Sequence, residues 1–265
     1  AEGTADSVGA GEAVPLARDG VLRVGELVAR NLSLHAADIE DIADTADKQA
    51  VIGARVTELR QRWWQRGLDF EPWRERSDVV VVVRYTALLE ELEEAQLQAQ
   101  TLLSMRQVEP YRDATMGLLR HLSDISDTMT LWLRVQDLWS SLESVFMGTD
   151  ISRQLPADSR RFARADREWA ALMAKAEELH TVSACTGNDS LRSTLPRLLD
   201  AFEMARHRLE GFLELKRGQL PRLFLVSDQA LLTLLSKGSD PMAVQPLYSK
   251  LFEAVTRVVH ARPTP

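Results

Sequence analysis

The sequence has 265 residues but only one cysteine, Cys185, and its longest strongly apolar run covers five residues, Val79–Val83. A single thiol excludes an intrachain disulfide and a zinc site of several cysteines, and it is typical of a reducing compartment. The apolar run is far shorter than the roughly 20 residues that a membrane-spanning helix needs. Residues 1–20 contain Asp, Glu, Gly and Pro where a signal peptide has its apolar core. We therefore expect no membrane partner and no secretory signal.

An excess of basic residues is also missing. The chain has 32 Lys and Arg against 39 Asp and Glu, so its net charge is −7 and its pI is about 5.4. We expect no nucleic-acid partner, because neutralising phosphates requires a basic face. The 45% hydrophobic and 27% charged residues are typical of a folded chain, and the length suits one large domain or two ordinary ones. The chain begins with Ala1 rather than Met, which indicates a fragment or a processed product.

The motifs of common nucleotide-binding and hydrolytic sites are absent as well. No G-x-x-x-x-G-K-[ST] phosphate loop and no G-x-S-x-G nucleophile elbow occurs in the chain. The stretch Gly9-Ala10-Gly11 lacks the third glycine of a dinucleotide-binding turn. We therefore predict that this chain is not an enzyme by itself and holds no cofactor of its own.

A few residues permit a chemical site, and each has a simpler explanation. Glu177 and His180 form an E-x-x-H pair, as di-iron bundles require, but no second pair follows, and a solvated helix end explains them without a metal. Cys185 follows His180 by five residues, which allows a thiol–imidazole pair; a lone buried cysteine is the alternative. Arg160 and Arg161 could meet an anionic partner, or they are exposed arginines at a helix start.

After residue 20 the apolar spacing is mainly helical. We expect a flexible lead-in over residues 1–20 and one helical domain over residues 21–265. The stretch Leu22–Ala50 suits two helices or one broken helix. Further helices are expected near residues 47–66, 87–107, 111–146, 157–179, 190–219, 229–237 and 241–259.

One β-hairpin is predicted near residues 68–85. The valines of Val79–Val83 suit a strand, because β-branched side chains lose freedom in a helix. A lone two-stranded hairpin is marginal in water, so it should lie on the helical body. The predicted fold class is therefore all-α: an elongated array of long-helix bundles with one small hairpin.

Two of the long helices carry heptad-like apolar seams. The helix expected over residues 111–146, which has roughly 36 residues, would be about 54 Å long and would act as a strut. The first seam is Leu118, Leu122, Ile125, Met129, Trp132, Trp139 and Phe146, and the second is Leu191, Leu195, Leu198, Phe202, Ala205, Leu209 and Phe212.

Other side chains are assigned to the core or to the surface by the same spacing. Trp63 and Trp169, like Trp132 and Trp139, fall on helical seams and are predicted to be core residues rather than a ligand cage. The acidic run of Glu90, Glu91, Glu93 and Glu94 is predicted to be the solvated face of a helix whose dry face is Leu88, Leu89 and Leu92.

A series of short motifs resembles the dynein heavy chains. Trp132-Leu133-Arg134-Val135-Gln136, Leu138-Trp139 and Leu142-Glu143 are similar to the W-L-x-V-Q-x-x-W-x-x-L-E pattern of that family. The motifs that follow in the same order are Asp150-Ile151, Gln154-Leu155-Pro156, Arg161-Phe162, Asp166-x-x-Trp169, Gly211-Phe212-Leu213-Glu214, Pro221-Arg222-Leu223-Phe224 and Asp240-Pro241 with Val244-Gln245-Pro246. The order and spacing together are specific, and the resemblance covers roughly residues 22–252.

The resemblance names residues that we predict to be structural rather than catalytic. They are Trp132, Gln136, Trp139, Asp150, Pro156, Phe162, Trp169, Pro221, Arg222 and Phe224. Gly218-Gln219 and Leu223 depart from the family pattern, so the packing near them is an open question. Cys185-Thr186-Gly187 and Asp150-Ile151-Ser152 are more similar to the axonemal branch than to the cytoplasmic one.

In that family this region is the linker, which lies N-terminal to a ring of AAA+ modules and changes between bent and straight as the ring hydrolyses ATP. The resemblance implies a mechanical linker segment. Its partner would be the AAA+ ring of the same heavy chain, which binds the ATP, with other dynein subunits as further partners and the microtubule reached only indirectly. The implied location is the cytoskeleton, in the axoneme of a cilium or flagellum. Two alternatives remain: a free-standing helical scaffold that binds a protein partner, and a bundle metalloenzyme built around Glu177 and His180.

Overall fold

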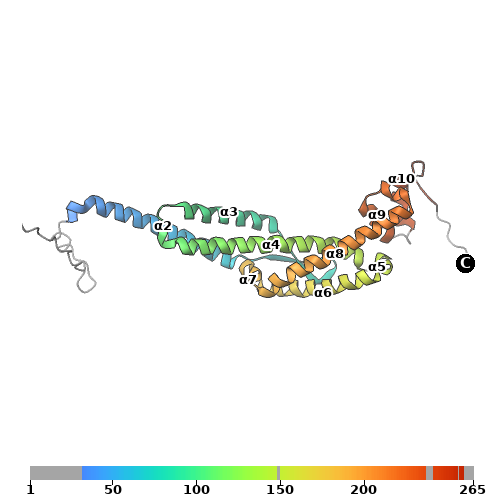
Figure 1. The fold of residues 1–265 in the computed structure, drawn as a ribbon, viewed down its shortest axis with the longest axis horizontal. Coiled ribbons are helices and arrows are strands. Elements are labelled where there is room, and N and C mark those ends of the chain that lie inside the picture. Colours follow the sequence, from blue (N-terminus) through green and yellow to red (C-terminus); the bar gives the residue numbers. More distant parts are fainter. Residues whose placement is uncertain (1–31, 148–149, 237–240, 256, 260–265) are drawn as a thin grey trace, which may run out of the picture.

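The computed structural model describes residues 32–147, 150–236, 241–255 and 257–259. The predicted lead-in, residues 1–20, and the first part of the stretch expected from Leu22 lie outside the described residues. The molecule is an elongated, mainly helical rod with one hairpin, which confirms the predicted fold class (Figure 1). Within the described residues, no helix combines the length and the apolar character that crossing a bilayer requires.

The long helices run back and forth along the rod and lie side by side (Figure 1). In chain order the elements are η1 (Leu32–His35), α2 (Ala36–Gln65), β1 (Asp69–Trp73), β2 (Arg76–Val83), α3 (Tyr85–Ser104), η2 (Glu109–Tyr111), α4 (Arg112–Phe146), α5 (Asp150–Gln154), α6 (Pro156–Leu179), α7 (Val182–Thr186), α8 (Asp189–Gln219), η3 (Pro221–Leu225), α9 (Asp228–Ser236) and α10 (Pro241–Leu251). The N-terminal part of α2 projects beyond the other helices at one end, and α9 and α10 lie at the other (Figure 1).

Two predicted helix boundaries are wrong. The helix expected to break between Leu22 and Ala50 is one continuous α2 from Ala36 onward, where the Asp44 and Lys48 side chains pair across one turn and support the helix. The last helix ends at Leu251 instead of reaching Val259. It ends early because the chain turns back, and the Gln245 side chain bonds the backbone N–H and C=O of Val258.

The apolar seams form the main core, as predicted. Every residue of the α4 seam is buried, and so are the seam tryptophans Trp63 and Trp169. In α8 the seam is buried as far as Leu209, but Leu213 then takes the buried position instead of Phe212. The reason is helical drift, because a strict seven-residue repeat falls behind the 3.6-residue turn and a step of four restores the face.

The hairpin lies on the helical body, as expected. Strands β1 and β2 pair antiparallel with Phe70 opposite Val82, and the two-residue turn contains Arg74 at φ 51°. Val79 and Val82 are buried, and β2 packs against α6. Burial on the helices supplies the stability that two strands lack alone.

A second, smaller core lies at the C-terminal end of the rod. It consists of Leu213, Leu223, Val226, Leu231, Leu247 and Leu251. The helix α8 contributes to both cores, with residues up to Leu209 in the first and Leu213 in the second. Leu223, where the family pattern differs, is buried in this second core.

Two helical glycines should respond to alanine in opposite ways. A Cβ at Gly53 in α2 would run into the Tyr111 ring, whereas a Cβ at Gly117 in α4 would meet no atom within 4 Å. Gly117→Ala should therefore raise the free energy of unfolding by about 0.5–1 kcal/mol, because alanine is the better helix former. Gly53→Ala should lower it by about 1–3 kcal/mol through overpacking. Chemical denaturation of both variants measures this, and equal stabilisation by the two would contradict the packing at Tyr111.

Candidate functional site

Three polar side chains occupy buried seam positions where the helical spacing calls for apolar ones. Gln136 and Glu143 in α4 are each 7% exposed, and Asp166 in α6 is 3% exposed. All three lie where the hairpin crosses the helices, and hairpin groups reach each of them. We call this group, with Trp73, Arg76, Asp78 and Trp139, the hairpin clamp.

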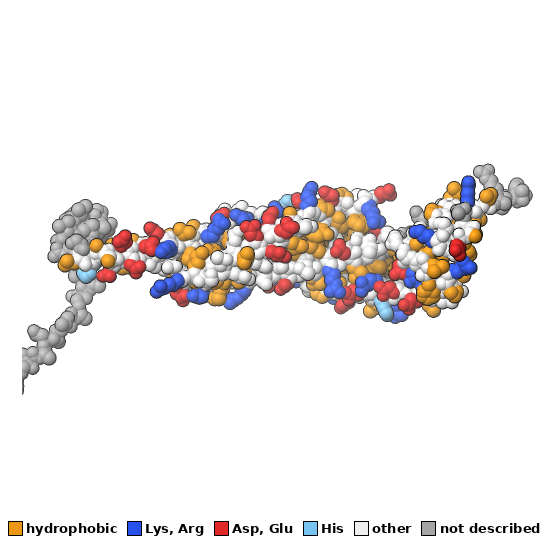
Figure 2. Space-filling view, turned by 90° about the horizontal axis from the view of Figure 1, so that it is seen from above, with side chains coloured by type: hydrophobic (Ala, Val, Ile, Leu, Met, Phe, Trp, Pro, Cys, Tyr) orange, Lys and Arg blue, Asp and Glu red, His pale blue; other side chains and the backbone are white. Residues whose placement is uncertain are grey.

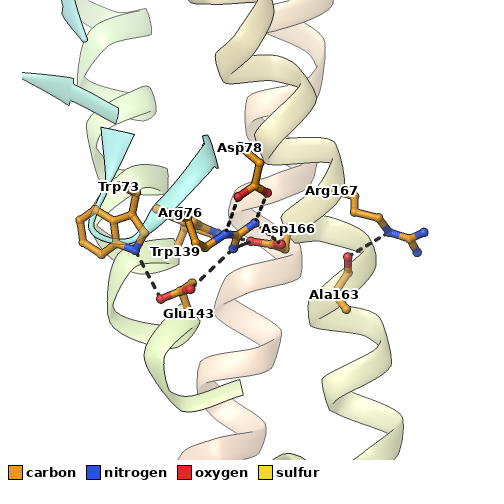
Figure 3. A network of polar contacts seen from close by, with 8 residues as sticks. All are labelled: Trp73, Arg76, Asp78, Trp139, Glu143, Ala163, Asp166 and Arg167. Atoms are coloured by element: carbon orange, nitrogen blue, oxygen red, sulfur yellow. Dashed lines mark hydrogen bonds and ion pairs between the residues drawn. The ribbon is translucent and has the colours of Figure 1, made fainter. Parts of the chain in front are cut away.

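The centre of the clamp is Arg76, the first residue of β2 (Figure 3). Its guanidinium forms a two-pronged contact with Asp166, with Nη1 2.9 Å from Oδ1 and Nη2 3.1 Å from Oδ2. It also donates to Asp78 on the same strand, and its Nη1 lies 3.6 Å from Glu143 Oε1. A planar guanidinium suits this role because its five N–H donors match carboxylate geometry. One side chain from the hairpin therefore neutralises acids from two helices.

Two indoles complete the polar contacts. Trp139 Nε1 donates to Asp166 Oδ1 at 2.8 Å, and Trp73 Nε1 donates to Glu143 Oε2 at 3.3 Å. The Trp73 and Trp139 rings lie 5.2 Å apart between centroids, and the Arg76 guanidinium is 6.0 Å from the Trp139 ring. These contacts give the buried carboxylates donors on several sides, which lowers the cost of removing them from water.

Gln136 holds the hairpin at a second point. Its Oε1 accepts a hydrogen bond from Val82 N at 2.8 Å, and its Nε2 donates to Val82 O at 2.9 Å. The amide therefore satisfies both backbone groups on an edge of β2 that has no strand neighbour in the two-stranded sheet. A buried strand edge without such a partner would be costly.

Two charged groups of the clamp, Arg76 and Asp78, have pKa values shifted in favour of their ionised forms. The hydrogen bonds that Arg76 donates to Asp78 and then to Asp166 raise the pKa of Arg76 further above its ordinary value. The hydrogen bond from Arg76 lowers the pKa of Asp78. The clamp contains no activated nucleophile, and its geometry suits a fixed joint between hairpin and helices rather than a reaction.

The other predicted structural residues of the first core pack close to the clamp. Trp132 and Trp169 are fully buried, and the Trp169 ring lies 5.8 Å from that of Trp139. Phe162 packs between the rings of Phe146 and Phe202, at 5.1 and 5.6 Å. Pro156 is exposed and begins α6, a position that suits its fixed φ angle. Asp150 begins α5, and its side chain lies outside the described ones.

The remaining predicted residues lie far along the chain, at the second core. Pro221 begins η3, and Arg222 Nη1 donates to the carbonyl of Leu251 at 3.1 Å. Phe224 is 67% exposed, so its side chain is on the surface rather than in this core. The structure therefore divides the motif residues into two groups rather than one site.

The alternative sites gain no support from the geometry. Glu177 and His180 are exposed, and across the described residues no three or more His, Cys, Asp or Glu side chains come together as a metal site. Cys185 is buried and bonds the carbonyl of Ala176, so the lone buried cysteine is confirmed. Burial raises the pKa of its thiol to about 12. Arg160 and Arg161 are exposed, as predicted for arginines at the start of a helix.

The sequence carried a signal for the clamp that the prediction did not use. Asp166 lies four residues after Phe162 and three before Trp169, and therefore on the buried stripe of α6. Glu143 lies four residues after Trp139 and three before Phe146, on the stripe of α4. Acids at such positions demand a cationic partner. No spacing rule identifies Arg76 as that partner.

A second junction joins α2, α4 and α7 at another point along the rod. The His121 ring stacks on Trp64 with centroids 4.4 Å apart, and its Nε2 lies 3.0 Å from Ser183 Oγ. Ser183 donates its own proton to the carbonyl of Trp63, so its oxygen accepts from His121. Burial lowers the pKa of His121, an effect that the nearby Asp124 partly opposes.

Comparisons with known proteins place the chain in a sequence family. A family model described as "Dynein heavy chain, N-terminal region 2" matches residues 12–264. The chain is 33% identical over 223 residues to dynein axonemal heavy chain 5 of Rattus norvegicus, covering 83% of the chain and 6% of that relative. It is 32% identical over 231 residues to dynein axonemal heavy chain 8 of Homo sapiens, covering 86% and 5%. It is 31% identical over 243 residues to the flagellar outer arm dynein gamma chain of Chlamydomonas reinhardtii, covering 91% and 5%. The chain therefore spans about one-twentieth of the length of these curated relatives.

Removing the central cation should cost much more stability than removing an exposed one on the same hairpin. Arg76→Met leaves Asp166 buried with an indole as its remaining donor, so we expect a loss of about 3 kcal/mol in the free energy of unfolding. Arg84 also pairs with hairpin acids, but its side chain is 67% exposed, so Arg84→Met should cost less than about 1 kcal/mol. Urea titration of both variants measures the difference, and equal losses would mean that the buried pair does not hold the hairpin.

The lowered pKa of His121 predicts the direction in which the free energy of unfolding changes with pH. In the unfolded chain the imidazole recovers its ordinary pKa of 6.5, so below that pH the unfolded state binds more protons than the folded state. The contribution is therefore complete above the unfolded pKa and is lost as the pH falls below that value toward the lower pKa of the folded state. His121→Phe keeps a ring on Trp64 and should flatten this slope, whereas His207→Gln, at a side chain 84% exposed, should leave it unchanged. Denaturation midpoints across this pH range decide the point, and an unchanged slope in His121→Phe would contradict it.

Proposed function

Since this chain belongs to the dynein heavy chains, as part of their N-terminal region 2, we propose that it is a segment of the mechanical linker that transmits conformational change from the ATP-driven ring toward microtubule-based movement. The strut α4, 35 residues and therefore about 52 Å long, is packed along one face from Leu118 to Phe146. A helix supported over its whole length resists bending, which a lever requires.

The hairpin clamp supports the same role. Arg76 connects the hairpin to α6 and approaches α4, and Gln136 connects α4 to β2. These cross-links oppose sliding between the strut and its neighbours, because sliding would separate buried charges. The second core continues the rod through α8, so a displacement at one end is passed to the other.

The remaining parts of the proposal follow from the family. ATP would be bound and hydrolysed by the AAA+ ring elsewhere in the heavy chain, and this segment would neither turn over ATP nor hold a cofactor. Its partners would be that ring and other dynein subunits, with the microtubule reached only indirectly. The relatives carry axonemal, ciliary and flagellar names, so we place the protein in the axonemal cytoskeleton of a cilium or flagellum.

A kink between the two cores tests the lever in the full-length heavy chain. Gly211 is an exposed residue of α8 between Leu209 and Leu213, and a Cβ there would meet no atom within 4 Å. Gly211→Pro removes a helical hydrogen bond and bends α8 at a local cost of about 3 kcal/mol. We expect microtubule gliding to fall below half of the normal velocity while ATP turnover by the ring is retained.

Gly211→Ala is the matched control, because it keeps the helix straight and should leave gliding intact. Circular dichroism of both variants verifies that the cores remain folded. Normal gliding by a folded Gly211→Pro protein would exclude the lever. A parallel loss of gliding and of ATP turnover would indicate that the segment supports ring catalysis instead.

A further inference from the structure

An apolar groove lies between α2 and α3, away from the hairpin clamp. Its volume is about 660 Å³, and buried Ile52 and Leu102 belong to its lining. Three large apolar side chains on its walls are open to solvent: Val51 is 70% exposed, Leu97 63% and Met105 40%. Apolar side chains gathered in one groove are a usual mark of a binding surface.

The groove has a strongly acidic border. Over its whole length α2 carries six acidic residues against Lys48, Arg55, Arg60 and Arg62, and α3 carries four glutamates and no Lys or Arg. Figure 2 shows acidic side chains along the part of α2 that projects beyond the other helices. The acids concerned are Asp38, Glu40, Asp41, Asp44, Asp47, Glu58, Glu90, Glu91, Glu93 and Glu94. Asp44, Glu58 and Glu91 already pair with Lys48, Arg55, Arg62 and Arg66, so the attraction for a basic ligand comes mainly from the other seven acids.

The acids and the groove share one face of α2. Glu40, Asp44, Asp47 and Val51 follow one another at steps of four, three and four residues, which places them along one stripe of the helix. On α3 the lining runs from Glu94 to Met105, about 17 Å along the helix axis. The surface is therefore an apolar trough of about three helical turns that leads onto an exposed acidic ridge.

We propose that this groove binds an amphipathic helix rich in lysine or arginine, supplied by another polypeptide. Its apolar face would cover Val51, Leu97 and Met105, and its basic flanks would meet the acids of α2 and α3. The charge selects this occupant, because an acidic helix or an anionic membrane surface would be repelled. Helix-in-groove recognition places apolar anchors at intervals of three and four residues along the bound helix. The proposal does not depend on the lever function.

The test uses two synthetic peptides and the whole chain. Both peptides have about 18 residues, with leucines at intervals of three and four. In one the remaining positions are mainly lysine, and in the other mainly glutamate. Fluorescence anisotropy of the labelled peptides should show binding of the lysine peptide only, with an affinity that falls as salt is added.

Two leucine variants locate the binding. Leu97→Gln removes an apolar wall of the groove and should weaken binding about tenfold. Leu215→Gln, at a leucine of α8 that is 69% exposed and outside the groove, should leave binding unchanged. Both sites are on the surface, so neither substitution should unfold the chain.

Three outcomes would overturn the proposal. Equal binding of the glutamate peptide would remove the charge argument. Equal weakening by the two leucine variants, or no weakening by either, would mean that the lysine peptide binds elsewhere. Self-association of the chain in light scattering that Leu97→Gln abolishes would assign the groove to a second copy.

Discussion

The carboxylate of Asp166 imposes the main constraint on this fold. It sits on the buried stripe of α6, where an unpaired charge would be very costly, and the cation that neutralises it comes from the hairpin. Arg76 can reach it only if β2 lies on α6, so one ion pair fixes the position of the hairpin. The bond from Trp139 to the same carboxylate then ties α4 to α6 at this point. The hairpin is thus part of the connection between strut and bundle, not an appendage.

The helical architecture could be predicted because it depends on local periodicity. The seams of α4 and α8 were visible as spacings of three, four and seven, and apart from the start of α2 and the end of α10 the predicted helices begin and end within three residues of the observed ones. The prediction was wrong where a contact outside the local pattern decides the structure. The Gln245 side chain bonds the backbone of Val258 where the chain turns back after α10. Neither residue interrupts the apolar spacing from which a longer helix was predicted. A different cause, the drift of a seven-residue repeat against the 3.6-residue turn, places Leu213 rather than Phe212 at the last buried position of the α8 seam.

The clamp was only half predictable, for a physical reason. Gln136 and Trp139 were named by the family pattern, and the acids at seam positions indicated that a buried cation was needed. The identity of that cation was not available, because Arg76 and Asp166 are separated by 90 positions and no periodicity connects them. Phe224 is the opposite case, because the family motif identified the residue but could not show whether its side chain is buried. The ring is exposed, and its centroid lies 5.9 Å from the Arg217 guanidinium.

The distribution of packing along the rod determines where it can bend. The α4 strut has a continuous core beneath it and the clamp across it, so bending there would break many contacts at once. The helix α8 is different, because the first core ends at Leu209 and the second begins at Leu213. Roughly one turn of helix bridges the two cores, and it contains Gly211, which has no side chain to stiffen the turn. Bending is therefore easier in that turn than along α4, although the partly buried Phe212, Leu232 and Leu235 pack against both cores and α5 packs against α9. A displacement applied at the projecting end of α2 would pass through the clamped region with little distortion and would reach the second core through this bridge and the α5–α9 contact.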